Sequence, residues 1–377
     1  MTKKGYNRRE FLKVVGAGTG LALTGCAPEV PEKIVPYLVQ PDEVVPGLAT
    51  FYSSTHTSNG VSTSVVLRTR EGRVIGIDGN PEHPLTKGGV MPAVIASLQM
   101  HYSPDRLREP LIRQDKGGLL PAKWSDAIAK IVESVSDKSK EFVIVTPEVS
   151  GSLPKLIAEF AALHGNVRHV VFSSGSEEQH DLAVQDVFGP KKSADYRFDK
   201  SDVIFSVGAG FLESFGNVAL NTRRWAARRK PEDGVVTHHV HVEPRLSLTA
   251  ANADDWVSNS AGTEDAILLS LAAELLKLPA RNGSVAAAGE SLRKLVGARG
   301  SSALLRDTSV EVGQIQKIAR LIHLAKSPLV IAGGEATTLV SERKCAEIAL
   351  LINAFLGNVG DTLIVYTDSR ESVAKYS

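Results

Sequence analysis

The second half of the chain alternates short apolar runs with longer amphipathic segments. Apolar runs of strand length lie at residues 142–145, 167–172, 202–207, 235–242 and 328–332. Helical periodicity is present at residues 153–163, 179–188, 216–229, 263–276 and 339–356. Strands that alternate with helices indicate a parallel, doubly wound sheet. The pattern therefore predicts an α/β fold for residues 136–377, with a mobile excursion at the glycine- and alanine-rich residues 281–300.

Residues 51–135 have a different pattern. Residues 61–70 are rich in β-branched side chains, and residues 73–78 alternate apolar and polar positions after the turn at Glu71-Gly72. Residues 124–135 have the spacing of an amphipathic helix. We expect a small β-rich region that precedes the α/β part.

The first 25 residues have the pattern of a secretory signal. A basic start is followed by an apolar run at residues 14–23, which at about ten residues is half of the roughly 20 that a membrane-spanning helix needs. The start resembles the twin-arginine export signal. The residues that carry this resemblance are Arg8, Arg9, Phe11, Leu12 and Lys13.

A cysteine ends this signal. Residues 23–26 read Leu-Thr-Gly-Cys and resemble a lipobox, in which cleavage leaves Cys26 as an acylated N-terminus. Acyl chains attach a protein to a membrane lipid surface without spanning it. Residues 26–50 contain five prolines, which exclude a helix and predict an extended tether. We expect export by the twin-arginine route and a lipid anchor at the periplasmic face of the cytoplasmic membrane.

Charge and cysteine content exclude several functions. Lys and Arg number 43 and Asp and Glu number 42, so no overall field favours nucleic acid. Only two cysteines are present, and Cys345 falls on the apolar face of a predicted helix. No cysteine cluster is available for an iron-sulfur centre or a structural zinc. His239 and His241 share one face of a strand, but we expect no metal site and no catalytic residue on this chain.

Two features remain as candidate binding residues. Gly208 and Gly210 follow the apolar run 202–207 at the carboxyl end of a predicted strand, where α/β folds place ligands, but the third glycine of a dinucleotide motif is missing. They are either a turn or a ligand-binding edge. The second feature is a basic cluster at a predicted helix C-terminus, either a solvated helix end or a docking surface for an acidic partner. It contains Arg223, Arg224, Arg228 and Arg229.

Several strings together resemble one family. Residues 70–84 read REGRVIGIDGNPEHP and are similar to the N-terminal region of molybdopterin oxidoreductase catalytic subunits. Residues 102–107 continue the resemblance, and residues 242–249, 253–256 and 353–360 resemble the central α/β domains of that family. The resemblance implies mostly parallel, doubly wound sheets of the molybdopterin oxidoreductase type. It also groups Glu243 and Arg245 with Gly208 and Gly210 as a vestigial ligand edge.

The departures from the family concern its cofactors. Members that hold a [4Fe–4S] cluster have cysteines just before the Glu-Gly-Arg-Val strand and after the Asn-Pro turn, whereas residues 51–60 and 88–92 contain none here. Residues 51–135 therefore resemble a cluster domain without its cluster. The sequence also ends at Ser377, before the barrel that helps these enzymes to bind the pterin. We expect neither molybdenum nor an iron-sulfur cluster on this chain.

Residues 201–212 and 243–254 resemble the large periplasmic subunit of alternative complex III. That resemblance implies a cofactor-free structural or assembly subunit of a membrane-associated quinol oxidoreductase. Its partners would be iron-sulfur, haem and integral membrane subunits of the same complex. Two alternatives stay open. The chain is the front part of a split molybdopterin-dependent oxidoreductase completed by another chain, or it is a periplasmic lipoprotein that binds a nucleotide-like ligand at Gly208 and Gly210.

Overall fold

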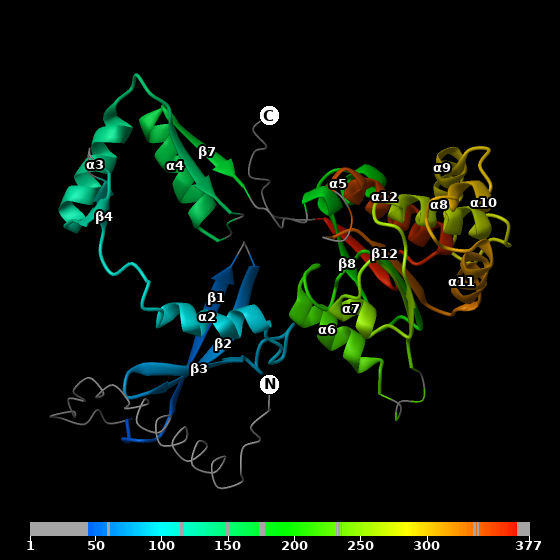
Figure 1. The fold of residues 1–377 in the computed structure, drawn as a ribbon, viewed down its shortest axis with the longest axis horizontal. Coiled ribbons are helices and arrows are strands. Elements are labelled where there is room, and N and C mark those ends of the chain that lie inside the picture. The colour runs from blue at the N-terminus through cyan, green and yellow to red at the C-terminus, as the bar shows by residue number, and fades with distance from the viewer. Residues whose placement is uncertain are drawn as a thin grey trace, which may run out of the picture. The chain divides into compact units, whose positions relative to one another are not determined.

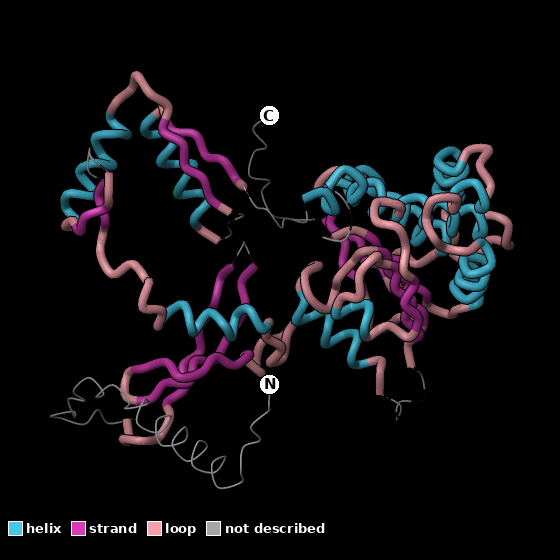
Figure 2. The backbone as a smooth tube through the Cα atoms, in the orientation of Figure 1, coloured by secondary structure: helices cyan, strands magenta, loops and turns pink. Residues whose placement is uncertain are grey.

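A computed structural model describes residues 44–58, 61–113, 117–147, 149, 151–172, 178–230, 232, 234, 236–334, 337 and 339–367. The chain divides into two units, residues 1–50 and 51–377, and the second contains the elements shown in Figures 1 and 2. The export-signal residues and Cys26 lie outside the described residues. Within the described residues, no helix is long and apolar enough to cross a membrane.

The first part of the larger unit is a three-stranded sheet. Its strands are β1 (Thr50–Ser58), β2 (Val61–Arg70) and β3 (Arg73–Gly79), in that order. Strands β2 and β3 pair antiparallel around Glu71 and Gly72, which both have positive φ as a two-residue hairpin turn requires. Helix α2 (Pro92–His101) adds Val94 to a small core with Val65 and Ile77. The predicted hairpin is thus confirmed.

The Asn-Pro turn after β3 is closely packed. The Asn80 side chain donates to Ser64 Oγ at 3.0 Å and accepts from the Glu82 amide at 3.0 Å. The carbonyl oxygen of Gly88 approaches Gly79 so closely that a Cβ at residue 79 would lie 2.1 Å from it. Only glycine fits at this position, because backbone cannot move away as a flexible side chain would.

A smaller α/β module follows. The short strands β4 (Leu111–Arg113) and β5 (Leu119–Pro121) pair antiparallel. Helix α3 (Trp124–Ser136) leads to β6 (Phe142–Thr146), and helix α4 (Leu153–His164) connects β6 to its parallel partner β7 (Val167–Val171). The Asn166 side chain donates to the carbonyl oxygens of Val135 and Lys140 and ties the end of α3 to β7.

The main body is built on a four-stranded parallel sheet. Its order is β11 (Asp255–Val257), β10 (His238–Val242), β9 (Val203–Val207) and β12 (Pro328–Ala332). The surrounding helices are α5 (Glu178–Phe188), α6 (Val218–Ala227), α7 (Leu248–Ala251), α8 (Glu264–Leu275), α9 (Ala286–Val296), α10 (Ser301–Leu304), α11 (Val312–Leu324) and α12 (Leu339–Leu356).

The sheet is buried on both faces. Phe205 of β9 points into one apolar cluster with α8, α9 and α11, which lie together in Figure 1, and Ile204 points into a second cluster with α5. Burial of successive strand residues is what a sheet covered on both sides requires. The predicted α/β fold with a doubly wound parallel sheet and an N-terminal β region is therefore confirmed.

One prediction about the main body is wrong. Residues 281–300 contain helix α9, in which Leu292 is fully buried and Val296 is 6% exposed. Their spacing of four residues places both on the face that packs against the core. The small residues Ala288 and Gly289, one turn earlier in the helix, are also buried, so this segment is a packed helix rather than a mobile excursion. The sequence also did not predict that β8 (Lys192–Tyr196) pairs antiparallel with β13 (Leu363–Thr367). Cys345 is buried as predicted, and burial raises the pKa of its thiol.

Candidate functional site at the carboxyl edge of the main sheet

Three strands of the main sheet end at one edge. Strand β9 continues into Gly208 and Gly210, β10 into Glu243, and β12 into Gly333 and Gly334. The Gly208 amide donates to the carbonyl oxygen of Val242 at 2.9 Å, which ties the first two ends together. The structure thus brings the glycines and Glu243 of the candidate ligand edge into one place.

The loop after β9 uses its own backbone amides. The amides of Glu213, Ser214 and Phe215 all donate to the carbonyl oxygen of Gly210 at 2.8–3.0 Å. The Leu212 amide donates to Thr249 Oγ1 at 3.3 Å. An anion-binding loop needs amides that are free to point at the ligand. In this loop these four amides are already satisfied within the chain.

A hydrogen-bonded chain of side chains runs below the edge, within the β9–β10 pair. Ser206 Oγ lies 2.8 Å from His239 Nε2 and 2.6 Å from His241 Nδ1. His241 Nε2 lies 3.0 Å from Glu243 Oε2, and Arg245 Nε donates to Glu243 Oε1 at 2.8 Å. His239, His241 and Glu243 are at most 1% exposed. The alternation predicted for the two histidines is therefore confirmed.

The charge of Glu243 determines which atom donates in each of these hydrogen bonds. Burial would raise the pKa of Glu243, but hydrogen bonds from His241, Ser247 and Arg245 outweigh burial and lower it. A Glu243 carboxylate only accepts, so His241 must carry its proton on Nε2. Ser206 then donates to His241 Nδ1 and accepts from His239 Nε2, which leaves His239 Nδ1 unprotonated. That nitrogen is buried and has no hydrogen-bond partner among the described residues.

His239 is therefore a neutral group in the core. Burial, and next the neighbouring His241, lower the pKa of His239 to about 3. Within the described part of the chain, no group of three His, Cys, Asp or Glu side chains is arranged to hold a metal ion. Hydrogen bonds occupy both ring nitrogens of His241 and Nε2 of His239, which leaves only His239 Nδ1 without a partner among the described residues. The sequence signal for this network was the alternating His-x-His-x-Glu pattern of β10, whose link through Ser206 depends on strand pairing.

The charges at the edge are unfavourable to a phosphate group. Arg245 is held by Glu243, and its Nη2 lies 3.9 Å from Glu213 Oε1. Glu213 Oε2 also accepts from the Leu248 amide at 3.2 Å. Two carboxylates surround one arginine, so the local charge is negative and repels an anion. Together with the satisfied amides, these residues do not fit a pterin or nucleotide phosphate.

A third carboxyl group lies at the β12 end of the edge. Glu342 on α12 accepts from the Gly334 amide at 3.2 Å, and it is 6% exposed. Burial raises the pKa of Glu342, and the hydrogen bond from Gly334 only partly offsets this. Glu342 was not identifiable as a site residue from the sequence, because its position in the edge depends on how α12 packs.

The basic cluster at the C-terminal end of α6 is largely engaged within the chain. Arg224 binds both carboxylate oxygens of Asp195, at 2.5 and 3.0 Å. Arg229 binds Asp254 at 2.6 and 3.1 Å, and its guanidinium lies 4.8 Å from the centre of the Trp225 ring. Two of the four arginines proposed for partner contact are thus internal anchors.

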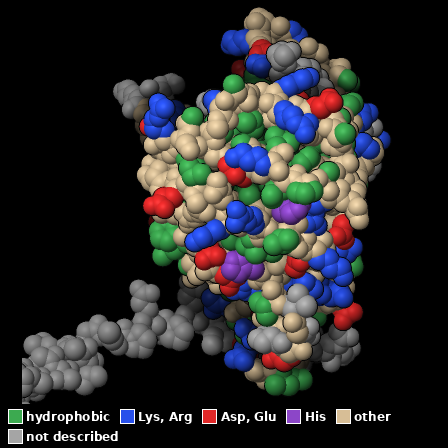
Figure 3. Space-filling view, turned by 90° about the vertical axis from the view of Figure 1, so that its right-hand side faces the viewer, with side chains coloured by type: hydrophobic (Ala, Val, Ile, Leu, Met, Phe, Trp, Pro, Cys, Tyr) green, Lys and Arg blue, Asp and Glu red, His purple; other side chains and the backbone are tan. Residues whose placement is uncertain are grey.

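The other two arginines differ in exposure. Arg223 is exposed and donates to the carbonyl oxygen of Leu85 at 3.1 Å. The Nε atom of Arg228 is buried and has no partner among the described residues. Elsewhere, Figure 3 shows basic and acidic side chains interspersed over one face. Arg223 is therefore the member of the cluster best suited to an external contact.

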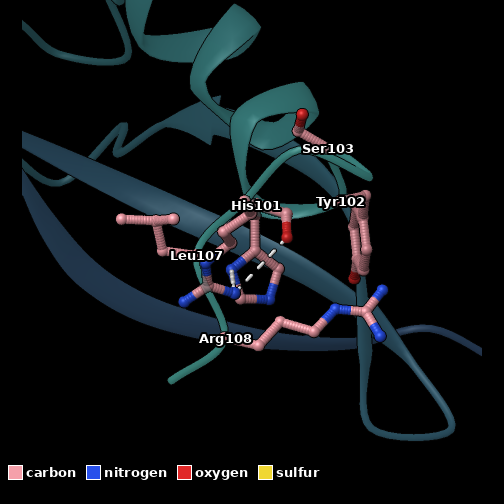
Figure 4. Close-up of a pocket in the computed structure, with 6 residues that line it drawn as sticks. His101, Tyr102, Ser103, Leu107 and Arg108 are labelled. Atoms are coloured by element: carbon pink, nitrogen blue, oxygen red, sulfur yellow. Dashed lines mark hydrogen bonds between the residues drawn. The ribbon is translucent and has the colours of Figure 1, made fainter. Parts of the chain in front are cut away.

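Two cavities lie away from the sheet edge. One of about 350 Å³ is lined by residues that include His101, Tyr102 and Arg108, and Figure 4 shows them at the end of α2. The other, about 530 Å³, contains Arg281, which donates to the carbonyl oxygens of His323 and Ala325. Arg281 thereby caps the C-terminus of α11, so this cavity has a structural explanation.

Comparison with known proteins identifies the family. The model of the family described as molybdopterin oxidoreductase matches residues 106–370. A menaquinone reductase molybdopterin-binding-like subunit from Nitratidesulfovibrio vulgaris is 30% identical over 277 residues, which are 72% of this chain and 40% of that protein. The molybdopterin-containing subunit of arsenate respiratory reductase from Shewanella sp. is 25% identical over 280 residues, 70% of this chain and 32% of that protein.

A solved structure shares the fold. Acetylene hydratase from Pelobacter acetylenicus superposes with a TM-score of 0.59 at 16% identity, over 82% of this chain and 44% of that one. The chain spans less than half the length of each of these relatives. Because the family model covers most of the sequence, the chain belongs to the molybdopterin oxidoreductase family.

Proposed function

We propose that this chain is a cofactor-free structural and assembly subunit of a membrane-associated respiratory quinol oxidoreductase similar to alternative complex III. The observation that carries the proposal is the carboxyl edge of the main sheet. Its loop amides are satisfied by the chain itself, and Arg245 is neutralised by Glu243 and Glu213. The name of the menaquinone reductase relative, a molybdopterin-binding-like subunit, supports both the respiratory setting and the missing cofactor.

Electron transfer then belongs to partner subunits. The sequence has no cysteine in residues 51–60 or 88–92, where cluster-bearing family members have theirs. We propose that separate chains carry iron-sulfur clusters and haem, and that integral membrane subunits carry the quinol site. This chain contributes a folded body on which they assemble.

The route to that complex is also a proposal. Export by the twin-arginine route depends on Arg8 and Arg9, and acylation of Cys26 provides the lipid anchor at the periplasmic face. Mass spectrometry of the native protein should find residues 1–25 absent and a lipid mass on Cys26. Replacing both arginines by lysine should leave precursor in the cytoplasm, because lysine does not reproduce guanidinium geometry. Normal export of that variant would contradict the route.

The test of the main proposal starts from the native complex. We expect this chain to copurify with iron-sulfur and haem subunits from detergent-solubilised membranes, and its deletion to abolish quinol oxidation. Elemental analysis of this chain, separated from its partners, should give neither molybdenum nor iron. Recovery as a monomer, with quinol oxidation intact after deletion, would reject the proposal.

One observation favours a second function. The relatives include molybdopterin-containing subunits, of which this chain spans about a third. If the chain were one part of a split molybdopterin enzyme that another chain completes, it would also match only part of such a relative. Stoichiometric molybdenum in the purified assembly would select this alternative, and its absence would select the first. No observation favours the nucleotide-binding alternative, because the Gly208–Gly210 edge does not fit a phosphate.

A further inference from the structure

The turn that precedes helix α9 contains an asparagine followed by a glycine. Residues 281–284 read Arg-Asn-Gly-Ser, and the Ser284 amide donates to the carbonyl oxygen of Arg281 at 3.2 Å. Gly283 has a φ of +81°, which glycine adopts without strain. Asn282 and Gly283 therefore form the apex of a tight turn.

Both apex residues are open to solvent. Asn282 and Gly283 are exposed, and within the described part of the chain neither the Asn282 side chain nor the Gly283 amide makes a hydrogen bond. Burial or hydrogen bonds would hold the side-chain amide in one orientation. The Asn282 side chain is instead free to turn its Cγ atom towards the backbone nitrogen of the next residue.

The residues on either side of the apex are fixed. The Arg281 guanidinium donates to the carbonyl oxygen of Ala325 at 2.7 Å and to that of Leu356 at 3.3 Å. The Val285 amide donates to the carbonyl oxygen of Ala354 at 3.1 Å. These bonds join the turn to the ends of α11 and α12. The apex therefore keeps its exposed position in the folded chain.

An asparagine and glycine placed in this way can react with each other. The backbone nitrogen of Gly283 loses its proton and attacks Cγ of Asn282. The Cγ–Nδ2 bond breaks, and the amide group takes up a proton and leaves as ammonia, so that a five-membered succinimide ring remains. Glycine has no side chain to block this approach.

Water completes the reaction. It adds to one of the two ring carbonyl groups and opens the ring. Opening at Cγ gives aspartate, whereas opening at the main-chain carbonyl gives isoaspartate, in which the main chain runs through Cβ and Cγ. One water molecule is consumed and one ammonia is released, with no oxidant or reductant.

We propose that Asn282 is a deamidation site of the folded chain and is converted through a succinimide to aspartate and isoaspartate. Arg281 and Lys326 line the same cavity of about 530 Å³ as Asn282, and nearby cations favour the deprotonated form of a group. The reaction requires no partner or cofactor, so it does not depend on the proposed function.

Isoaspartate would disturb the packing of this turn. The carbonyl oxygen of Asn282 lies so close to Gly357 that a Cβ at residue 357 would be 2.6 Å from it. Isoaspartate adds one carbon to the main chain at this contact, where two backbone segments already touch. We therefore expect the hydrogen bond between the Ser284 amide and Arg281 to break. The reaction is a slow, irreversible change that loosens the turn before α9.

Asn259 provides a matched control within the same chain. It precedes serine, which is also small, but it is 5% exposed. Its Nδ2 donates to the carbonyl oxygen of Ser260 at 2.8 Å and to Glu264 Oε1 at 3.0 Å. Burial and these bonds hold its side chain in place. A second Asn-Gly pair in the sequence, at residues 59–60, lies outside the described residues and is mapped separately.

Peptide mapping by mass spectrometry tests the site. The purified full chain is incubated in mildly alkaline buffer, with a second sample in urea, and each peptide is followed for the mass increase that replacement of –NH2 by –OH causes. In the folded chain we expect Asn282 to convert at least tenfold faster than Asn259, and in urea we expect the two rates to approach each other. Conversion of Asn282 in urea but not in the folded chain would overturn the proposal, as would equal rates in the folded chain.

Hydrogen exchange tests the consequence for the turn. The isoaspartate form is separated by ion exchange, and its Ser284 amide should exchange at least tenfold faster than in the unmodified chain. Asn282→Asp has the new charge with a normal main chain, so it should retain the unmodified rate. Equal exchange in the isoaspartate form and in Asn282→Asp would overturn the effect assigned to the altered main chain.

Discussion

Arg224 allows a quantitative test of whether the basic segment of α6 supports the fold or a partner. Its guanidinium binds both oxygens of Asp195 and the carbonyl oxygen of Tyr196. The side chains of Arg224 and Asp195 are 15% and 35% exposed. Asp199 lies 3.8 Å from Arg224 Nε. We therefore predict that Arg224→Ala and Arg224→Glu lower the stability of the chain itself.

The expected magnitude follows from exposure and distance. Exposed ion pairs contribute about 0.2–1 kcal/mol, and breaking a buried pair costs about 3–5 kcal/mol. The intermediate burial of this pair places Arg224→Ala at about 2 kcal/mol. Arg224→Glu adds repulsion from two carboxylates, each about 4 kcal/mol at 4 Å for an effective dielectric constant near 20. Because the new side chain can turn towards solvent, we expect a total of about 3–5 kcal/mol.

The assay is urea denaturation followed by circular dichroism, arranged as a double-mutant cycle of Arg224→Ala and Asp195→Ala. We expect a coupling energy of about 1–2 kcal/mol. Arg223→Glu is the control, since Arg223 is exposed and, among the described residues, its guanidinium donates to the carbonyl oxygen of Leu85. Its effect on unfolding should stay below about 1 kcal/mol. A coupling energy near zero, together with lost partner binding in folded Arg224→Ala, would refute the assignment of Arg224 to the fold.

Three further predictions concern the fold that supports the site. Asn353→Leu should destabilise the chain by about 2–4 kcal/mol in urea denaturation, because the Asn353 side chain hydrogen-bonds to both the amide and the carbonyl oxygen of the buried β12 residue Val330. The control is Asn252→Leu at an exposed position, which should cost under about 1 kcal/mol. Gly79→Ala should cost at least about 1–3 kcal/mol, since its Cβ would lie 2.1 Å from a carbonyl oxygen, and a wild-type melting curve would contradict that close approach. Burial lowers the pKa of His180 to about 4 and of His239 to about 3, so the unfolded chain binds more protons below pH 6.5 and stability should fall as pH decreases, by about 1.4 kcal/mol per pH unit for each histidine. His180→Leu should remove about one such increment from the slope between pH 6 and 4.5, and an unchanged slope would show that His180 does not titrate on unfolding.

The fold class was predictable because the local patterns of apolar and polar residues indicate the strands and helices. The apolar run of β12 is continuous and that of β9 is interrupted only by Ser206, as expected for strands buried on both faces, and the segments between them have helical spacing. The position of Gly208 at the end of β9 followed from the same pattern. Helix α9 was not predicted, because the weight given to glycine and alanine hid the spacing of Leu292 and Val296.

The chemistry of the candidate edge was only half predictable. The sequence identified Gly208, Gly210, Glu243 and Arg245 as a group through resemblance to the family. Whether they bind a ligand depends on which other side chains lie at the edge. One of these is Glu213, which comes from the neighbouring loop and lies close to Arg245. Spacing along a chain does not reveal that two carboxylates share one arginine, because that arrangement arises from strand order.

The sequence by itself determined the alternation of strands and helices, the hairpin with its Asn-Pro turn, and the absence of cysteine ligands. Tertiary structure alone decided that the basic segment of α6 is anchored at Asp195 and Asp254. The physical reason is the range of the interactions. Backbone geometry and side-chain periodicity act over a few residues, whereas ion pairing and burial depend on groups that only folding brings together.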